Sequence, residues 1–220
     1  MRTLTSWLRC FAVAGLAALT SCTYAGDSEN PVVRSLTWFS YIGGEDIRAS
    51  CQASAPDRYR FVYNGHYALQ IRAYELAPAG ADAELTVRAR GRSGDIGRLS
   101  FDEPFGPWTL DHGTARLSNS QAAAIVTALS DAVATAPPAA GQSMQSYEFY
   151  WVVTACSAGK FRLYVFRWPE LEVDDLPFVP LLLAHDRSGV PFQKTRQIEG
   201  MKEYSFGIAI NARGDGLVGR

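Results

Sequence analysis

Apolar and polar residues alternate with a period of two along much of the chain, which is the pattern of strands that bury one face. Segment 85–89 shows it most simply, because Leu85, Val87 and Ala89 alternate with polar residues. The run Val32–Ile42 is rich in β-branched and aromatic residues and ends at two glycines, so it also predicts a strand. Shorter strands are expected at residues 97–101, 114–117, 178–184 and 203–210.

A first β-hairpin is expected around Asn64 and Gly65, a dipeptide typical of tight turns. With a two-residue loop, Phe61 would face Ala68, and the apolar residues of the two strands would lie on opposite faces. A three-residue loop instead pairs Phe61 with Tyr67, which brings the apolar residues onto one face. Gly65 supplies the left-handed conformation that such a loop needs. We therefore predict the three-residue loop.

A second hairpin is predicted from Tyr147–Cys156 and Phe161–Trp168, with the three residues 157–159 as its turn. Apolar residues occupy both faces of these strands, which indicates a sheet that is covered on both sides. The alternation then assigns Trp151, Val153, Leu163 and Val165 to one face, and Tyr150, Val152, Tyr164 and Phe166 to the other.

One amphipathic helix is predicted at about 118–136. Ser118 and Gln121 have the spacing of a capping box, and Pro137 ends the helix. The apolar residues that follow at helical spacing are Ala122, Ile125, Val126, Leu129, Ala132 and Val133. Together these elements predict an α+β fold: a mainly antiparallel, partly curved sheet with this helix packed on it.

The N-terminal segment has a different pattern. Arg2 and Arg9 flank a charged start, and the apolar run Cys10–Leu19 follows, as in a secretory signal peptide. This run is shorter than the about 20 residues that span a membrane. Its end, Leu-Thr-Ser-Cys at 19–22, resembles the lipobox of bacterial lipoprotein precursors. The resemblance implies cleavage before Cys22 and a diacylglycerol on its thiol, and an ordinary signal peptide is the alternative.

The same resemblance implies a cell-envelope location. Thr23 stands where an aspartate typically retains such lipoproteins at the inner membrane, so an outer-membrane lipoprotein facing the periplasm is implied, with acyl chains such as palmitate in the membrane. We expect a signal peptide at 1–21, a lipid-anchored tether at 22–30, a single domain at 31–210 and a flexible tail at 211–220. Eight flexible tether residues would span only about 16 Å.

Two cysteines remain after the leader and the anchor, Cys51 and Cys156. Two thiols in an oxidising compartment usually pair, so we predict a disulfide between them. Removal of Arg2 and Arg9 leaves 19 basic against 22 acidic residues, and nothing in this balance favours a nucleic-acid partner.

Candidate catalytic residues occur at two Asp-His neighbours. His185, Asp186 and Ser188 could form a hydrolase site, as could His112 with Asp111, but both segments read as turns, and no Gly-x-Ser-x-Gly motif occurs. We favour turns over catalysis. No cofactor or metal site is predicted, because the acidic residues lack the regular spacing of a calcium loop: Glu170, Glu172, Asp174 and Asp175.

Arginines recur on the polar faces of the early strands. If these strands are neighbours, they form a basic stripe that could bind anionic lipid or an acidic protein partner. A solvated face paired with nearby acidic residues is the alternative reading. The residues of the stripe are Arg58, Arg60, Arg72, Arg88 and Arg90.

These observations favour a non-enzymatic, membrane-anchored lipoprotein of the bacterial cell envelope that acts as a periplasmic binding or assembly accessory. One alternative is a carrier of a lipid or another hydrophobic ligand, and a second is an envelope hydrolase. An open apolar cavity under the helix would favour the carrier, a filled core the accessory, and a histidine hydrogen-bonded to a serine and a carboxylate the hydrolase.

Overall fold

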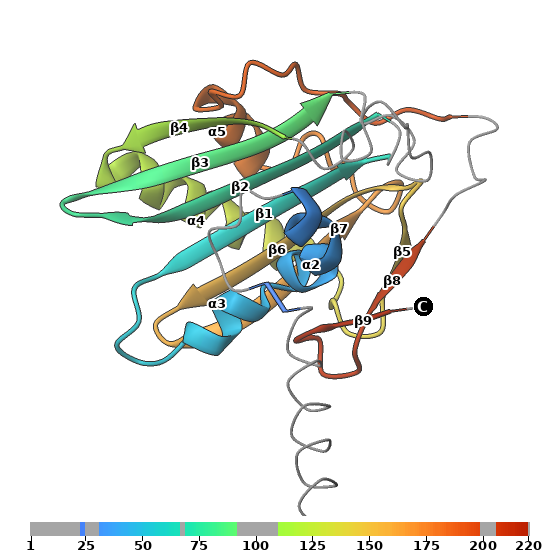
Figure 1. The fold of residues 1–220 in the computed structure, drawn as a ribbon, viewed down its shortest axis with the longest axis horizontal. Helices are drawn as coiled ribbons and strands as arrows, with labels where there is room; N and C mark the ends of the chain where they lie inside the picture. The colour runs from blue at the N-terminus through green and yellow to red at the C-terminus, as the bar shows by residue number, and fades with distance from the viewer. Residues whose placement is uncertain (1–22, 25–30, 67–68, 92–109, 199–205, 220) are drawn as a thin grey trace, which may run out of the picture.

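The computed structural model describes residues 23–24, 31–66, 69–91, 110–198 and 206–219, with residues 31–36 described by their backbone only. Its centre is a six-stranded antiparallel sheet with the order β4-β3-β2-β1-β6-β7 (Figure 1). The strands are β1 (Arg58–Gly65), β2 (Gln70–Ala79), β3 (Asp82–Gly91), β4 (Asp111–Leu117), β6 (Phe149–Ser157) and β7 (Lys160–Arg167).

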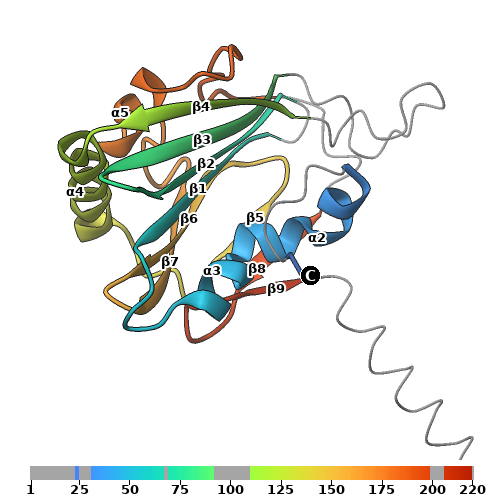
Figure 2. The ribbon, with the colours of Figure 1, turned by 60° about the vertical axis from the view of Figure 1, so that its left-hand side comes forward.

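Both faces of this sheet are covered (Figure 2). On one face lie the helices α4 (Asn119–Thr135) and α5 (Phe178–Ala184). The other face carries α2 (Pro31–Gly43), α3 (Glu45–Ser50) and a small sheet with the order β5-β8-β9. The strands of the small sheet are β5 (Ser143–Gln145), β8 (Gly207–Ile210) and β9 (Leu217–Gly219). The predicted α+β class is confirmed, with two covering layers instead of one.

The strand register separates two hydrophobic cores. Phe61 of β1 lies opposite Tyr74 of β2 and Val153 of β6, and all three are buried under α4 and α5. One residue further along β1, Val62 is buried in the core under α2. Because side chains alternate across a strand, each central strand contributes apolar residues to both cores.

The predicted helix and the strand over 85–89 are confirmed. Helix α4 begins after Ser118, whose hydroxyl accepts a hydrogen bond from the Gln121 backbone N–H at 3.3 Å. The Gln121 side chain in turn accepts one from the Ser118 N–H at 2.8 Å, so the capping box is complete. In β3, Leu85, Val87 and Ala89 are all buried on one face.

The second hairpin is confirmed, but the predicted assignment of its faces is wrong. Ser157 pairs with Lys160, so the turn has two residues and not three. This shifts the register by one residue, and Trp151 therefore lies opposite Phe166 and not opposite Val165. Trp151 and Phe166 consequently share the core under α4 and α5.

The predicted register of the first hairpin is wrong. Strand β1 continues through Gly65, which pairs with Gln70, and Phe61 faces Tyr74. Asn64 stays in the strand because its side-chain amide donates to the carbonyls of Ser146 and Glu148, at 2.9 and 2.6 Å. The longer pairing also buries Tyr74 and Leu76, which the predicted register left outside the hairpin.

Two segments predicted as strands are helices. Residues 32–42 lie within α2, where Trp38, Tyr41 and Ile42 are buried at helical spacing and Phe39 points outward. Residues 178–184 form α5, with Phe178 and Leu182 buried one turn apart. In both, packing of one helical face on the sheet outweighs the strand preference of β-branched and aromatic residues.

The predicted strand over 114–117 is confirmed within β4, and the end of the segment 203–210 is confirmed as β8. Residues 203–205 of that segment lie outside the described residues, as do 97–101 and the predicted signal peptide with Cys22. The predicted flexible tail is wrong for 217–219, which pair with β8 as β9. The Asn211 side chain orders the preceding turn by donating to Asp215 at 2.7 Å.

The predicted disulfide is confirmed. Cys51 follows α3, and Cys156 is near the end of β6. Their Cα atoms are 5.6 Å apart, within the range of an unstrained bond. The bond therefore ties the end of α3 to the large sheet, next to the first candidate site.

Candidate functional site

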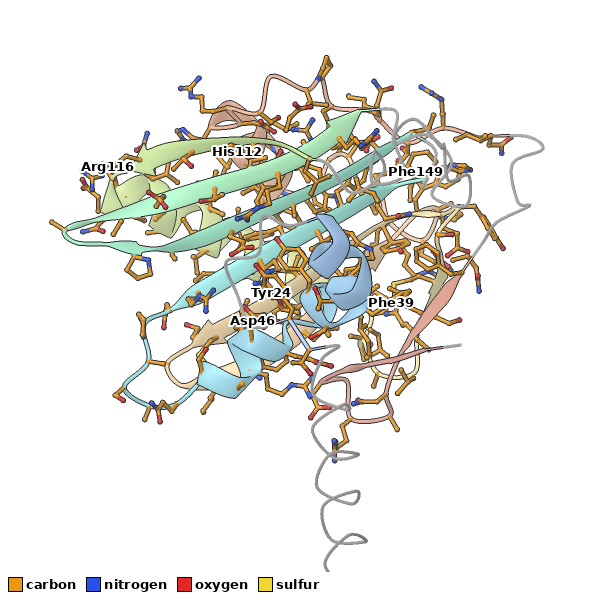
Figure 3. The ribbon with its side chains drawn as sticks, in the orientation of Figure 1. Tyr24, Phe39, Asp46, His112, Arg116 and Phe149 are labelled. Carbon is orange, nitrogen blue, oxygen red and sulfur yellow. A yellow bond between two sulfur atoms is a disulfide. The ribbon has the colours of Figure 1, made fainter. Side chains whose placement is uncertain are left out.

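The sheet face under α2 and α3 holds a group of charged and aromatic side chains, which we call the Arg60 cluster. Its members are Tyr24, Tyr41, Asp46, Arg60, Glu75 and Arg88. Arg60 on β1 is fully buried, and its two terminal nitrogens each lie 2.8 Å from one carboxylate oxygen of Asp46 on α3. Arg60 Nη1 also donates to the Tyr41 carbonyl at 2.8 Å. Asp46 and Tyr24 lie beside α2 and α3 (Figure 3).

Glu75 connects the second half of the cluster. It lies opposite Arg60 on β2 and accepts a hydrogen bond from the Tyr41 hydroxyl at 2.7 Å. Its carboxylate also lies 3.2 Å from Arg88 Nη1 and 3.5 Å from Arg60 Nε. Burial, and next the negative charge of Glu75, raise the pKa of Tyr41 well above its usual value. The two arginines of the cluster thus face its two carboxylates, so the charges within the cluster sum to zero.

Tyr24 closes the cluster from the N-terminal side. It is buried, and its backbone N–H donates to the Ser40 hydroxyl of α2 at 2.9 Å. Its ring meets Tyr41 edge to face at 4.9 Å between ring centres, and the Arg60 guanidinium carbon lies 5.3 Å from the Tyr24 ring centre. The segment predicted as a free tether is therefore fixed to the domain at Tyr24.

The five arginines predicted as a basic stripe do not form one exposed surface. Strands β1, β2 and β3 are neighbours, as that prediction required, but both sheet faces are covered. Arg60 and Arg72 are fully buried and lie on opposite faces. Arg88 pairs with Glu75 and is 16 % exposed, whereas Arg58 is 34 % exposed. Arg90 lies on the same face of β3 as Arg88 and is half-buried.

A second polar group lies on the α5 side of the sheet, and we call it the Arg72 clamp. Arg72 donates to a carboxylate oxygen of Asp186 and to the Val190 carbonyl. The Tyr74 hydroxyl donates to the same Asp186 at 2.7 Å, and the Ser188 hydroxyl donates to its other oxygen at 2.6 Å. Both oxygens of Asp186 are therefore occupied by donors from this clamp.

The clamp holds the chain that follows α5, residues 186–198, against the sheet; we call this the covering segment. Gln70 donates to the Pro191 carbonyl at 2.7 Å and accepts from the Gln193 N–H at 3.1 Å. At the edge strand β4, a methyl group on Gly113 would come within 2.3 Å of the Arg187 backbone. Side chains of β2 and close backbone packing on β4 thus fix this segment.

The structure does not assemble the predicted hydrolase residues into a triad. Ser188 donates to Asp186, whereas a nucleophilic serine would donate to a histidine base. His185 follows α5 as its C-terminal cap, and among the described residues no hydrogen bond joins it to Ser188 or Asp186. Asp111 and His112 are adjacent on β4 and exposed, with His112 opposite Arg88 (Figure 3).

A groove that the sequence did not indicate runs between α4 and the edge strand β7. It consists of two hollows of about 260 and 300 Å³ that share Val133 and Tyr164. The first hollow is also lined by Leu129, and has Lys160 and Arg162 among its polar residues. The residues of the groove come from α4 and from the edge of the sheet, which are separate in the sequence. Predicting the groove would therefore have required the correct register of β7, which decides which of its side chains face α4.

Within the described ranges, no group of three or more histidine, cysteine, aspartate or glutamate side chains is arranged to hold a metal ion. No helix there has the length and apolar character needed to cross a membrane. Comparisons with protein-family models, with curated proteins and with solved structures found no match for this chain.

Proposed function

We propose that this protein is a lipid-anchored accessory of the bacterial cell envelope that works by binding. The Leu-Thr-Ser-Cys sequence at 19–22 supports the anchor, and the burial of Tyr24 in the Arg60 cluster supports a domain held close to it. Two residues of chain span at most about 7 Å, so the folded body begins directly after Cys22. A lipid on Cys22 would therefore hold the domain close to the membrane. A long flexible linker would instead let the domain move away from the surface.

Binding is favoured over catalysis by the roles of the titratable residues near α5. Asp186 and Ser188 hold the covering segment through the Arg72 clamp, and their hydrogen bonds are already made within the protein. The groove between α4 and β7 is a surface that a partner could occupy, because it combines apolar residues such as Leu129 and Val133 with the charged Lys160.

A hydrophobic-ligand carrier is the second candidate, and the same groove is the observation that favours it. Ile125, Ala128 and Ala132 of α4 are buried in the core beneath the helix. A ligand would therefore lie beside α4, along Tyr164 and Val133, and not under the helix.

The anchor is tested by labelling cells with radioactive palmitate and separating membrane from soluble protein. The variant Cys22→Ser should lose the label and appear as precursor or soluble protein. Cys10→Ser is the matched control, because Cys10 lies in the leader outside the lipobox pattern, and this variant should keep the label. An unlabelled wild-type protein would contradict the proposal, as would labelled Cys22→Ser.

The two binding functions are separated by photo-crosslinking. A photoreactive residue at Ser130, which lines the groove, is compared with one at Ala123, which is exposed on α4 away from that lining. A protein adduct confined to position 130 supports the accessory, and a lipid adduct confined to it supports the carrier. Equal adducts at both positions would contradict a function of the groove.

A further inference from the structure

We propose that the outer surface of the layer formed by α2 and the small sheet lies on the membrane, with Phe39 and Val218 at the lipid interface. The proposal rests on the lipid anchor at Cys22 argued above. It adds an orientation: the α2 layer faces the bilayer, and the α4 and α5 layer faces away from it (Figure 2).

The proposed anchor leaves the domain beside α2. Tyr24 is bonded to Ser40 of α2 and packs edge to face on Tyr41 of the same helix. Because Cys22 is only two residues away, its Cα atom lies within about 7 Å of that of Tyr24. The acyl chains therefore enter the bilayer next to α2 and not next to the opposite layer.

Exposed apolar side chains mark the same layer independently of the anchor. Among the described residues, two large hydrophobic side chains are strongly exposed: Phe39, which is 45 % exposed, and Val218, which is 46 % exposed. Single exposed hydrophobic residues are ordinary on protein surfaces. Here both belong to the layer that holds Tyr24, since Phe39 lies on α2 and Val218 on β9.

Both side chains point away from the sheet. The Phe39 ring packs edge to face on Phe206, which immediately precedes β8, with 5.3 Å between ring centres. On β9, Leu217 packs inward, because a methyl group on Gly43 of α2 would lie 3.3 Å from Leu217 Cγ. Side chains alternate along a strand, so Val218 faces outward. The pair thus shares the outer surface of one layer (Figure 3 shows Phe39).

Phe39 and Val218 would give the domain a second contact with the membrane, in addition to the acyl chains. Aromatic and aliphatic side chains of a peripheral protein gain free energy when they enter the boundary between head groups and acyl chains. The anchor already holds the domain at the surface, so two such side chains suffice to favour one orientation over the others.

The orientation is tested with the native lipoprotein, purified and reconstituted into vesicles of phosphatidylethanolamine and phosphatidylglycerol. Cysteine is introduced singly at Phe39, at Val218 and, as the control, at Thr127, which is exposed on α4. Cys51 and Cys156 are paired and Cys22 carries the lipid, so a polarity-sensitive fluorophore labels the introduced thiol. Spin-labelled lipids then quench fluorophores that lie at the bilayer.

Quenching at positions 39 and 218 should exceed that at 127 by a factor on the order of two or more, because the interface is entered to a depth of only about 5–10 Å. Tyr24→Ala should remove this difference by freeing the anchor, whereas Tyr24→Phe, which keeps the ring, should preserve it. Equal quenching at all three positions, or stronger quenching at 127, would overturn the orientation.

The mass of the N-terminal peptide shows whether Cys22 carries a lipid. It therefore distinguishes a wrong orientation from a missing anchor. An unmodified Cys22 overturns the anchor and the orientation together. A lipidated Cys22 with equal quenching at the three positions overturns the orientation alone.

Discussion

Arg60 and Asp46 meet in a two-point ion pair, in which each terminal nitrogen of the buried guanidinium lies 2.8 Å from one carboxylate oxygen. The pair joins β1 to α3. The same guanidinium carbon lies 3.9 Å from the ring centre of Tyr41 and 5.3 Å from that of Tyr24. One buried side chain thus connects the large sheet, the helices α2 and α3, and Tyr24.

Replacing Arg60 should destabilise the protein strongly. Arg60→Gln leaves Asp46 without its buried countercharge, while Glu75 keeps Arg88. Breaking a buried pair such as Arg60–Asp46 typically costs about 3–5 kcal/mol. Arg58→Gln is the matched control: Arg58 lies 3.7 Å from the same Asp46 but is 34 % exposed, and exposed pairs contribute about 0–1 kcal/mol. Urea unfolding measures both variants. Equal losses of stability in the two would contradict the role assigned to Arg60.

The Arg72 clamp should behave as a coupled pair. Arg72→Met and Asp186→Asn should each lower the free energy of unfolding, and the double variant should lose less than their sum. Contacting residues of this kind show coupling of about 0.5–3 kcal/mol. A double-mutant cycle measures it, together with limited proteolysis of the covering segment, which should be cut faster in both single variants. Additive losses with unchanged proteolysis would show that the clamp does not hold this segment.

The histidines nominated for catalysis should be replaceable. His112→Ala and His185→Ala should each complement a deletion strain at normal protein abundance, because His112 is exposed on an edge strand and His185 caps a short helix. Changes in stability at such positions are usually within about 0.5 kcal/mol. Loss of complementation by His185→Ala at normal abundance would favour the hydrolase over the accessory.

Stability should fall steeply as the pH rises above about 10. Burial, and next Glu75, raise the pKa of Tyr41 in the folded state above the ordinary value of 10.0. Above that value the unfolded chain loses the proton while the folded protein keeps it, so stability declines by up to about 1.4 kcal/mol per pH unit for this residue. Below it, both states are protonated and this contribution is constant.

Tyr41→Phe should flatten this decline, although it also removes the bond to Glu75 and lowers stability at neutral pH. Tyr147→Phe, at a half-buried position outside the Arg60 cluster, is the control. The measurement is the urea-unfolding free energy between pH 8 and pH 11. An identical slope for wild type and Tyr41→Phe would contradict the assignment.

Elements whose signal is local were predictable from the sequence. Ser118 and Gln121 mark the start of α4, and the alternation at 85–89 marks β3, because both patterns depend on residues a few positions apart. The disulfide was predictable from the small number of remaining cysteines. In contrast, residues 32–42 carry strand-forming side chains, and only their packing on the sheet makes them a helix.

The candidate sites depended on contacts that the sequence does not display. Alternation correctly placed Arg88 and Arg90 on one strand face, but it could not show that Arg88 pairs there with Glu75, which also binds Tyr41 of α2. The covering segment hid Arg72 in the same way. The predicted pairing was shifted by seven residues in the first hairpin and by one in the second. Both shifts are odd, so they moved side chains to the wrong face, which is why the groove around Tyr164 was not foreseen.

We propose that a lipid on Cys22 holds this domain at the membrane through the docked Tyr24. The most direct test is mass spectrometry of the N-terminal peptide of the mature protein isolated from its native membrane. We expect a mature chain that begins at Cys22 and carries the mass of a diacylglycerol on the thiol. A mature chain that begins elsewhere, or an unmodified Cys22, would contradict it.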